Sequence, residues 1–409
     1  MSEKNIQDEI NVDITILGGG IAGLWLLNRL RSEGYNAILF EENRLGSSQT
    51  IASQGMIHGG IKYTLGGKLN NISEIIASMP KHWRACLAGE GDVDLSGASL
   101  LSDCMYLWST ASIKSKLSTF FASRATRGRM DAVAKADRPS VFQDKRFNGK
   151  LYRLQEIVVD VPSVIAALAD NCREAIFKID WQSAKFVQEN IGGGVDALEI
   201  EQDGKLLTIR SRRFIFSAGE GNEALLQELS IKRPEMQRRP LHQVLVKHDF
   251  PFPLYAHCIG VSSSPRLTVS SHQMADGKWI WYFGGSLATQ GVELSGFELI
   301  AKAKQELREV LPWIRFDHAE WGCLRINRAE AKQGNFMLPD MPFAKQAAGN
   351  VIVAWPTKLT LTPHLANEVL DLLRMQGIEP ESEFSELDLL ESLPRPELAL
   401  PFWDEVYFS

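Results

Sequence analysis

Residues 13–63 decide the fold, and they read DITILGGGIAGLWLLNRLRSEGYNAILFEENRLGSSQTIASQGMIHGGIKY. An apolar run at 14–17 leads into a glycine turn at 18–23 and then into a helical pattern of leucines. A second apolar run at 37–40 ends on Glu41. The order strand, glycine turn, helix, strand, acid is that of a dinucleotide-binding βαβ unit. The sequence therefore predicts an α/β fold with a Rossmann-type nucleotide-binding domain.

The residues of the glycine turn each have a mechanical reason. Gly18 allows the tight turn, Gly20 lets a pyrophosphate approach the backbone, and Gly23 lets the helix pack against the strand. The helix N-terminus, with Ile21 and Ala22, supplies free N–H groups and a partial positive charge for phosphates. We therefore expect these five residues to bind the cofactor phosphates or to shape the turn that does.

Two acids close the second strand. Glu41 lies where a carboxylate can accept hydrogen bonds from ribose hydroxyls, and Glu42 is the alternative contact. An acid in this position argues against a 2′-phosphate, so NADP is not expected.

The segment after these acids bears on the choice between NAD and FAD. An NAD domain would continue into another helix and strand, whereas residues 45–63 are small, polar and glycine-rich. Such a segment suits an extended run beside a second part of the cofactor. The predicted cofactor contacts in this segment are Thr50, Ser53, Gly55, His58 and Gly59.

The run at 57–63, IHGGIKY, carries a family resemblance. It resembles the D-amino-acid-oxidase-like (DAO) superfamily of FAD enzymes, and most closely the FAD-dependent glycerol-3-phosphate dehydrogenases. Their first βαβ unit is followed by a Ser-rich turn and an Ile-His-Gly-Gly-Leu-Arg-Tyr run. L-2-hydroxyglutarate oxidases carry a related version with one Gly replaced. The resemblance implies bound FAD, a GR2-like FAD-binding domain and a second, antiparallel-sheet substrate domain. No cysteine or histidine suggests a flavin link, so we expect FAD to be non-covalent.

Composition bounds the remaining possibilities. The 409 residues suit two domains. The net charge of −6 offers no basic footprint for nucleic acid, and no apolar run approaches the roughly 18 residues of a membrane span. Residues 1–9 lack a signal-peptide core, and the five scattered cysteines form no CxxC pair. We expect free thiols and a cytoplasmic protein, with peripheral association with the inner membrane left open.

The chain divides into discontinuous segments. We expect an FAD-binding domain from 12–87, 150–228 and 322–378, a substrate domain from 88–149 and 229–321, and a C-terminal strap from 379–409. Strand patterns at 243–246, 266–269 and 279–283 predict the antiparallel sheet. The pairs Asp203-Gly204 and Asp276-Gly277 predict two hairpin turns.

Two later segments are expected to return to the cofactor. A short strand at 213–217 ends on Ala218 and Gly219, and in the superfamily such an Ala-Gly corner packs over the cofactor. Residues 356–360, PTKLT, precede a helix whose N-terminus can stabilise negative charge on a reduced flavin. The glycerol-3-phosphate enzymes have Gly-Gly-Lys-Leu-Thr here. The core Lys358, Leu359 and Thr360 is therefore kept, while both glycines are replaced.

Four residues match substrate-side positions of that family, namely Tyr63, His242, Arg325 and Lys358. The resemblance implies that Arg325 holds a carboxylate or phosphate oxygen and that Lys358 supplies a second cation. His242 could accept the hydroxyl proton as hydride leaves for flavin N5. His58 is expected to be structural or flavin-adjacent. The other histidines have no metal-binding spacing, so we predict no metal site.

The predicted activity is FAD-dependent hydride transfer from a small anionic hydroxy compound, either a 2-hydroxy acid or glycerol 3-phosphate. One alternative is an amine or amino-acid oxidase of the same fold. Another is a flavin-binding module without turnover. The electron acceptor stays open among oxygen, a quinone and a partner flavoprotein.

Overall fold

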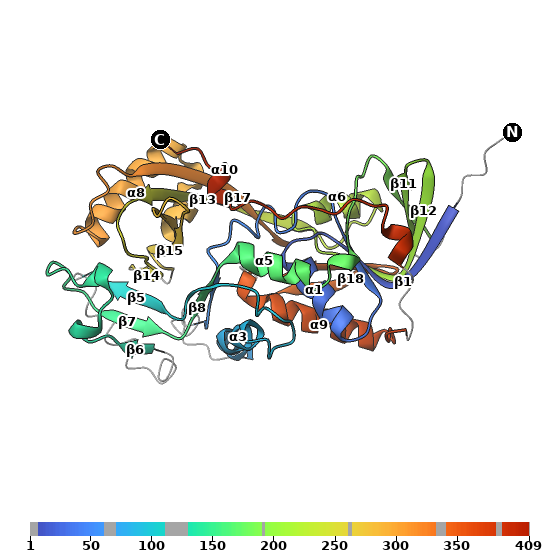
Figure 1. Ribbon diagram of the computed structural model, residues 1–409, viewed down its shortest axis with the longest axis horizontal. Helices are drawn as coiled ribbons and strands as arrows, with labels where there is room; N and C mark the ends of the chain where they lie inside the picture. Colours follow the sequence, from blue (N-terminus) through green and yellow to red (C-terminus); the bar gives the residue numbers. More distant parts are fainter. Residues whose placement is uncertain are drawn as a thin grey trace.

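The computed structural model describes residues 7–60, 71–110, 130–189, 193–260, 264–332, 341–381 and 387–408. Two large sheets occupy the two halves of an elongated molecule, and residues 402–408 lie beside the second sheet (Figure 1). Tyr63 lies outside the described residues. In the described part of the chain, no helix has both the length and the apolar character to cross a membrane.

The first sheet has a parallel centre. Its strands follow the spatial order β9 (Ile176–Lys178), β2 (Ala37–Glu41), β1 (Gln7–Leu17), β12 (Lys205–Phe216) and β19 (Val351–Trp355). Antiparallel additions are β10 (Ala184–Gln188) and β11 (Val195–Gln202) beside β12, and β18 (Phe343–Ala348) beside β19. The carboxyl ends of β1, β2, β12 and β19 therefore share one edge of the sheet, where open α/β sheets bind ligands.

Helices α1 (Ile21–Ser32), α5 (Val161–Asp170) and α9 (Thr362–Met375) belong to the core of this half. α1 is buried almost all round, and Trp25 and Leu27 have no exposed surface. Burying a large apolar side chain contributes about 1.5–3 kcal/mol. α1 is consequently held firmly between the sheet, α5 and α9, and it fixes the position of the glycine turn that precedes it.

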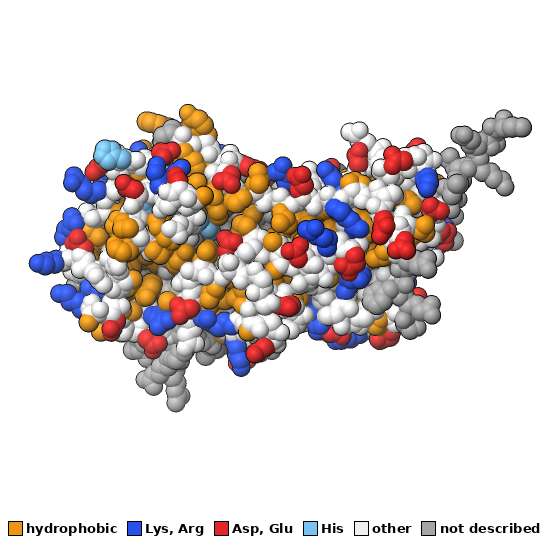
Figure 2. All heavy atoms as spheres, viewed as in Figure 1, with side chains coloured by type: hydrophobic (Ala, Val, Ile, Leu, Met, Phe, Trp, Pro, Cys, Tyr) orange, Lys and Arg blue, Asp and Glu red, His pale blue; other side chains and the backbone are white. Residues whose placement is uncertain are grey.

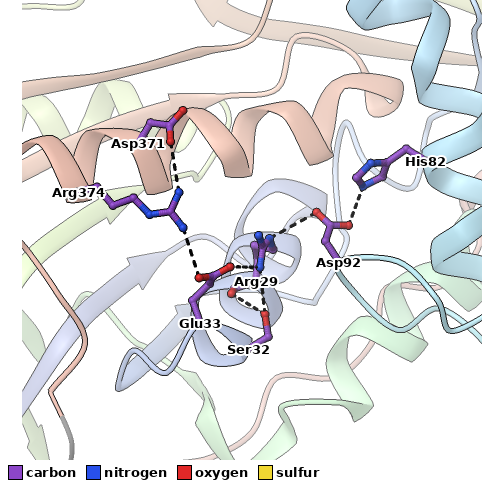
Figure 3. Close-up of polar contacts among 7 residues, drawn as sticks. All are labelled: Arg29, Ser32, Glu33, His82, Asp92, Asp371 and Arg374. Atoms are coloured by element: carbon purple, nitrogen blue, oxygen red, sulfur yellow. Dashed lines mark hydrogen bonds and ion pairs between the residues drawn. The ribbon is translucent and has the colours of Figure 1, made fainter.

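Charged side chains connect the helices around this sheet (Figure 3). Asp92 lies 2.7 Å from His82 Nε2 on α3 (Asn71–Leu87) and 3.5 Å from Arg29 Nε on α1. Arg29 also pairs with Glu33, which Arg374 of α9 approaches to 3.4 Å. Burial would raise the pKa of Asp92, but the His82 hydrogen bond and the neighbouring charges hold it below its usual value. The network therefore joins α3, α1 and α9.

The second sheet is mostly antiparallel. Its order is β17 (Glu320–Ala331), β13 (Met236–His248), β16 (Trp279–Gly284), β15 (Leu267–Gln273), β14 (Ala256–Ile259), β5 (Met105–Ser109), β7 (Leu151–Leu154) and β6 (Met130–Ala132). Only β14 and β5 pair in parallel among these strands. Helix α8 (Gly296–Val310) packs into the core of this half.

Both predicted hairpin turns occur. Asp203 and Gly204 join β11 to β12, and both have positive φ, 52° and 75°. Gly277, with φ 82°, lies in the turn between β15 and β16. Positive φ at both central residues is what a two-residue hairpin requires, and it explains the Asp-Gly pair.

A third, small sheet joins β3 (Met56–Ile57), β8 (Ile157–Val159) and β4 (Leu100–Ser102). β3 leads directly into His58, and β8 directly follows Glu156. The antiparallel pairing of β3 with β8 brings these two side chains close together across 98 residues of sequence.

The strand pairing shifts the expected domain boundaries. β7 and β17, which we expected in the FAD-binding domain, pair within the second sheet. We propose that both strands belong to the substrate domain.

Residues 387–408 run from the first sheet to the second. Ala399 N donates to Leu45 O at 2.9 Å, and Phe402 in α10 (Phe402–Glu405) packs 4.5 Å from the Tyr282 ring.

The face in Figure 2 carries basic and acidic side chains intermixed, without a continuous patch of either sign. Hydrophobic side chains gather mainly over the half that holds the second sheet. This face therefore offers no surface of the kind that binds nucleic acid through a basic stripe.

Candidate functional site

The glycine turn between β1 and α1 is closely packed against its surroundings. Gly18 has φ 109°, and a Cβ there would lie 2.5 Å from Ala218 Cα. A Cβ on Gly23 would lie 1.9 Å from Gly18 O. At Gly20, by contrast, a Cβ would meet only Thr50 Oγ1, at 3.2 Å. Gly18 and Gly23 are therefore required by the protein itself, whereas the space beside Gly20 is available to a ligand.

Thr50 and Glu41 hold the two sides of this turn. Thr50 Oγ1 accepts a hydrogen bond from Ile21 N at 3.1 Å. Glu41, at the end of β2, accepts from Gly19 N at 2.6 Å and from Asn43 N at 2.8 Å. Burial raises the pKa of Glu41, although these backbone donors oppose the shift. Its carboxylate lies at the carboxyl edge of the sheet, where a ribose would meet it.

One cavity of about 1200 Å³ runs from this edge to the second sheet. It exceeds the roughly 300–1,000 Å³ typical of small-ligand pockets, so it has room for a dinucleotide together with a substrate. Fourteen of the predicted cofactor residues line it: Gly18, Gly20, Ile21, Ala22, Glu41, Glu42, Thr50, Ser53, His58, Ala218, Gly219, Lys358, Leu359 and Thr360.

Three predicted cofactor residues lie behind the cavity wall instead. Gly23 packs against Gly18, as described above. Gly55 has φ 69°, and a Cβ there would lie 2.1 Å from Val159 O. Gly59 N donates to Glu156 Oε1 at 2.8 Å. Their contribution is to position the wall rather than to touch a ligand.

The turn before α9 keeps a left-handed backbone without glycine. Thr357 has φ 58° and is buried, and its hydroxyl donates to Pro356 O at 2.7 Å. Left-handed φ is costly for a β-branched residue, so the surrounding contacts must hold it. Lys358 and Thr360 follow at the cavity wall, immediately before the N-terminus of α9.

Thr360 connects this turn to His58. Its Oγ1 accepts from His58 N at 2.9 Å and donates to Met56 O at 3.3 Å. Trp83 Nε1 in turn donates to Thr360 O at 3.1 Å. The His58 backbone is thereby fixed beside the start of α9.

His58, Glu156 and His257 form a cluster, of which His58 lines the cavity. His58 Nδ1 lies 3.5 Å from Glu156 Oε2, and His257 Nε2 lies 3.9 Å from the same oxygen. The two imidazole rings stack at 5.5 Å. Burial would raise the pKa of Glu156, but His58 and His257, with Gly59 N, outweigh it and hold the pKa below its usual value. The carboxylate therefore stays ionised between the two imidazoles.

The ligand atoms of this cluster all lie within 4.8 Å of one another, a spacing that could hold a metal ion. Sequence spacing alone did not suggest this, because the three residues come from different strands or strand ends. The prediction that the protein has no metal site therefore stays a prediction, to be tested by experiment.

A row of side chains on the second sheet faces the same region. The pairing aligns His257 on β14, Thr268 on β15 and Gly284 on β16, and the row ends at Gln243 on β13. Gln54 occupies the space that a side chain at position 284 would need. Its Oε1 accepts a hydrogen bond from Thr268 Oγ1 at 2.7 Å. Tyr282 hydroxyl donates to Gln243 Oε1 and lies 2.7 Å from Ala52 O. This face offers neutral hydrogen-bonding groups to a polar ligand.

Comparisons with known proteins agree with this geometry. The model of the family described as FAD dependent oxidoreductase (DAO) matches residues 13–369. A probable FAD-dependent oxidoreductase of Pseudomonas aeruginosa is 46% identical over 400 residues, which cover 97% of this chain and 99% of that protein. The chain belongs to the DAO family of FAD-dependent oxidoreductases. FAD is accordingly its cofactor.

Solved structures support the same fold. The crystal structure of the Pseudomonas protein superposes with a TM-score of 0.83 at 42% identity, covering 97% of this chain and 99% of that one. Glycine oxidase of Geobacillus kaustophilus superposes with a TM-score of 0.62 at 15% identity, covering 91% and 96%. L-α-glycerophosphate oxidase of Mycoplasma pneumoniae, solved with FAD bound, gives 0.62 at 12% identity, covering 89% and 95%. The last two likenesses establish the fold alone, and neither favours the glycerol-3-phosphate subfamily.

The residues present fit FAD. The space beside Gly20 and the α1 N-terminus suit its pyrophosphate, and Glu41 suits its adenosine ribose. His58 and residues 357–360 also line the cavity, with the N-terminus of α9 directly after them, which suits the flavin end.

Two predicted substrate residues lie elsewhere. His242 and Arg325 are cross-strand partners, and neither lines the cavity. His242 is buried, and its Nδ1 lies 3.1 Å from Gly291 O. Arg325 is exposed and donates to Val292 O at 2.9 Å and Leu294 O at 2.7 Å. Leu241, Gln243 and Ile326 beside them do line the cavity, and a substrate role for His242 or Arg325 stays a prediction.

Sequence reasoning missed Gln54 and Gln243, which line the cavity, and Glu156 and His257, which lie beside His58. It also missed Thr268 and Tyr282, which bond to those two glutamines. Arg328 lines the cavity too, and it had a sequence signal, since it lies three residues beyond Arg325 in the same strand.

Proposed function

We propose that the chain oxidises a small anionic hydroxy compound, with His58 as the base that accepts its hydroxyl proton. FAD, when bound, supplies N5 as the hydride acceptor. One observation carries the proposal: an imidazole at the cavity wall lies 3.5 Å from a buried, ionised carboxylate. A histidine oriented by a carboxylate is the arrangement that general base catalysis uses.

The oxidation removes one hydride and one proton from the substrate. The hydride leaves the substrate carbon with the electron pair of the C–H bond. The O–H proton goes to His58, and the carbon–oxygen single bond becomes a carbonyl. Because His58 Nδ1 faces Glu156, its Nε2 is the nitrogen available to accept the proton. Glu156 would then stabilise the imidazolium, and His257, on the other side, would share that charge-stabilising carboxylate.

The base cluster favours a hydroxyl over an amine. A hydroxyl must lose its proton as hydride leaves, whereas a neutral amine can lose hydride with help from its own lone pair. A positioned base therefore matters far more for a hydroxy substrate. Lys358 at the cavity wall supports an anionic group on that substrate, which keeps 2-hydroxy acids and glycerol 3-phosphate as the leading classes.

A substrate panel tests the reaction class. Holoenzyme is mixed anaerobically with 2-hydroxy acids, polyol phosphates, neutral alcohols and amino acids, and loss of the oxidised-flavin absorbance is followed. We expect bleaching by an anionic hydroxy compound with release of the corresponding carbonyl compound. Bleaching by amino acids with ammonia release would instead establish an amine oxidase. No bleaching by any class, with full FAD occupancy, would favour a binding module.

Variants test the base once a substrate is known. His58→Asn should slow flavin reduction by about 10²- to 10⁴-fold, with FAD content unchanged. Glu156→Gln should give a smaller loss, because it only positions and stabilises the imidazole. His318→Asn, at an exposed position, is the matched control. Normal reduction by His58→Asn, or loss of wild-type activity on chelation, would contradict a metal-free His58 base.

A further inference from the structure

Arg328 is a cavity residue with no assigned role. It lies on β17, lines the cavity and is half-buried. Burial, followed by the charge of Arg239, lowers its pKa to about 10. A guanidinium removed from water is costly unless an anion compensates it, so its surroundings are informative.

The nearby carboxylate is already engaged. Glu330 accepts from Arg239 Nε at 2.5 Å and from Arg239 Nη2 at 2.8 Å, and it also accepts from Gln237. Arg328 Nε donates to Arg239 O at 3.3 Å, and among the described residues no carboxylate pairs with its terminal nitrogens. Arg328 therefore presents positive charge to the cavity.

The strand carrying Arg328 is fastened beside the phosphate turn. Ala329 N, the next residue, donates to Gln49 Oε1 at 3.0 Å. Gln49 precedes Thr50, whose hydroxyl accepts from Ile21 N at the start of α1. The same 46–50 turn is held to the glycine turn by Gly46 N, which donates to Gly19 O at 2.8 Å. Arg328 is thus located by contacts that lead to the pyrophosphate site rather than to the His58 cluster.

We propose that Arg328 binds the pyrophosphate of FAD from the second sheet, opposite the α1 N-terminus. A guanidinium fork matches phosphate oxygens, and two fixed positive groups on opposite sides would enclose the diphosphate. Because β17 pairs in the second sheet, the cofactor then links the two halves of the molecule. The proposal rests on the FAD cofactor and is independent of the substrate.

The test compares Arg328→Met, Arg328→Lys and the control Arg325→Met, whose exposed guanidinium donates to the backbone carbonyls of Val292 and Leu294. Each protein is purified as holoenzyme, and the release of FAD on dilution is followed by its fluorescence. The deflavinated proteins are then titrated with FAD, with ADP or riboflavin as competitors, and their circular dichroism is compared.

We expect Arg328→Met to weaken FAD and ADP by a similar factor, about 10- to 150-fold, because both carry the diphosphate. Riboflavin, which lacks phosphate, should compete equally well in all variants. Arg328→Lys should fall between, and Arg325→Met should match wild type. Wild-type FAD affinity in a folded Arg328→Met would overturn the proposal. A raised substrate KM in that variant would instead indicate that Arg328 binds the anionic group of the substrate.

Discussion

Replacing Gly23 with alanine should destabilise the protein even when no FAD is bound. The added Cβ would lie 1.9 Å from Gly18 O and 2.8 Å from Ser217 Oγ. Ordinary contact begins near 3.4 Å, so α1 would have to retreat by 3.4 − 1.9, about 1.5 Å, from the glycine turn. Nine of the twelve residues of α1 are buried, and the helix has no free direction in which to move.

The magnitude follows from what must give way. Overpacking a core costs about 1–3 kcal/mol, and here the obstacle is a backbone oxygen rather than a flexible side chain. We therefore expect about 3 kcal/mol, near the upper end. At about 2–4 °C per kcal/mol, as for domains of a few hundred residues, the unfolding midpoint of the FAD-free protein should fall by roughly 6–12 °C.

Gly20→Ala is the matched control. Its Cβ would meet only Thr50 Oγ1, at 3.2 Å, and Gly20 already has an ordinary extended backbone with φ −74°. The FAD-free midpoint of Gly20→Ala should therefore match wild type within about 2 °C. Its FAD affinity should nevertheless fall, because the methyl group enters the path of the pyrophosphate.

The assay is thermal unfolding of deflavinated proteins by circular dichroism, with FAD titrations in parallel. If Gly23→Ala unfolds at the wild-type midpoint, the glycine is not needed for helix packing and the clash has been overestimated. Should Gly20→Ala lower the FAD-free midpoint as much as Gly23→Ala, the division between a packing glycine and a binding glycine fails.

Two further predictions concern other groups. Glu41→Ala should weaken FAD binding about 10- to 150-fold without changing turnover at saturating FAD. The reason is that a hydrogen bond to a charged group contributes about 1.5–3 kcal/mol. An unchanged dissociation constant would instead assign the ribose contact to Glu42. Burial raises the pKa of Cys86 and Cys258 to about 12 and that of Cys172 and Cys323 to about 11. Few thiolates should therefore exist at pH 8, and a thiol reagent should label the native protein slowly and the denatured protein at once; rapid native labelling would show that these sites open.

Local signals predicted the cofactor half well. The β1–α1–β2 unit was readable because each part depends on residues next to it, such as the glycines at 18, 20 and 23 and the acid at 41. The Asp203-Gly204 hairpin was readable for the same reason, since its two positive φ angles belong to the pair itself. Short-range stereochemistry of this kind leaves a clear trace in sequence.

The substrate half was harder because its strands carry little alternation. Residues 242–246 of β13 are all buried, so burial pattern gives no hint that Gln243 rather than His242 faces the cavity. A shift of one residue sends every side chain to the opposite face. The His58, Glu156 and His257 cluster was equally hidden, because β3 and β8 pair in the small sheet whereas β14 belongs to the second sheet.

Thr357 shows what a motif comparison can miss. The sequence has Pro356 and Thr357 where the family's Gly-Gly-Lys-Leu-Thr turn has two glycines. Thr357 nevertheless has φ 58°, a region that favours glycine, and its hydroxyl bonds to Pro356 O. A left-handed residue without glycine costs of order 1–3 kcal/mol, so the turn is held by its surroundings rather than by its own preference. Thr360, which bonds to both His58 N and Met56 O, is one such restraint. The conformation of this wall is therefore a property of the packed site, and the residues that hold it need not be those that the family motif contains.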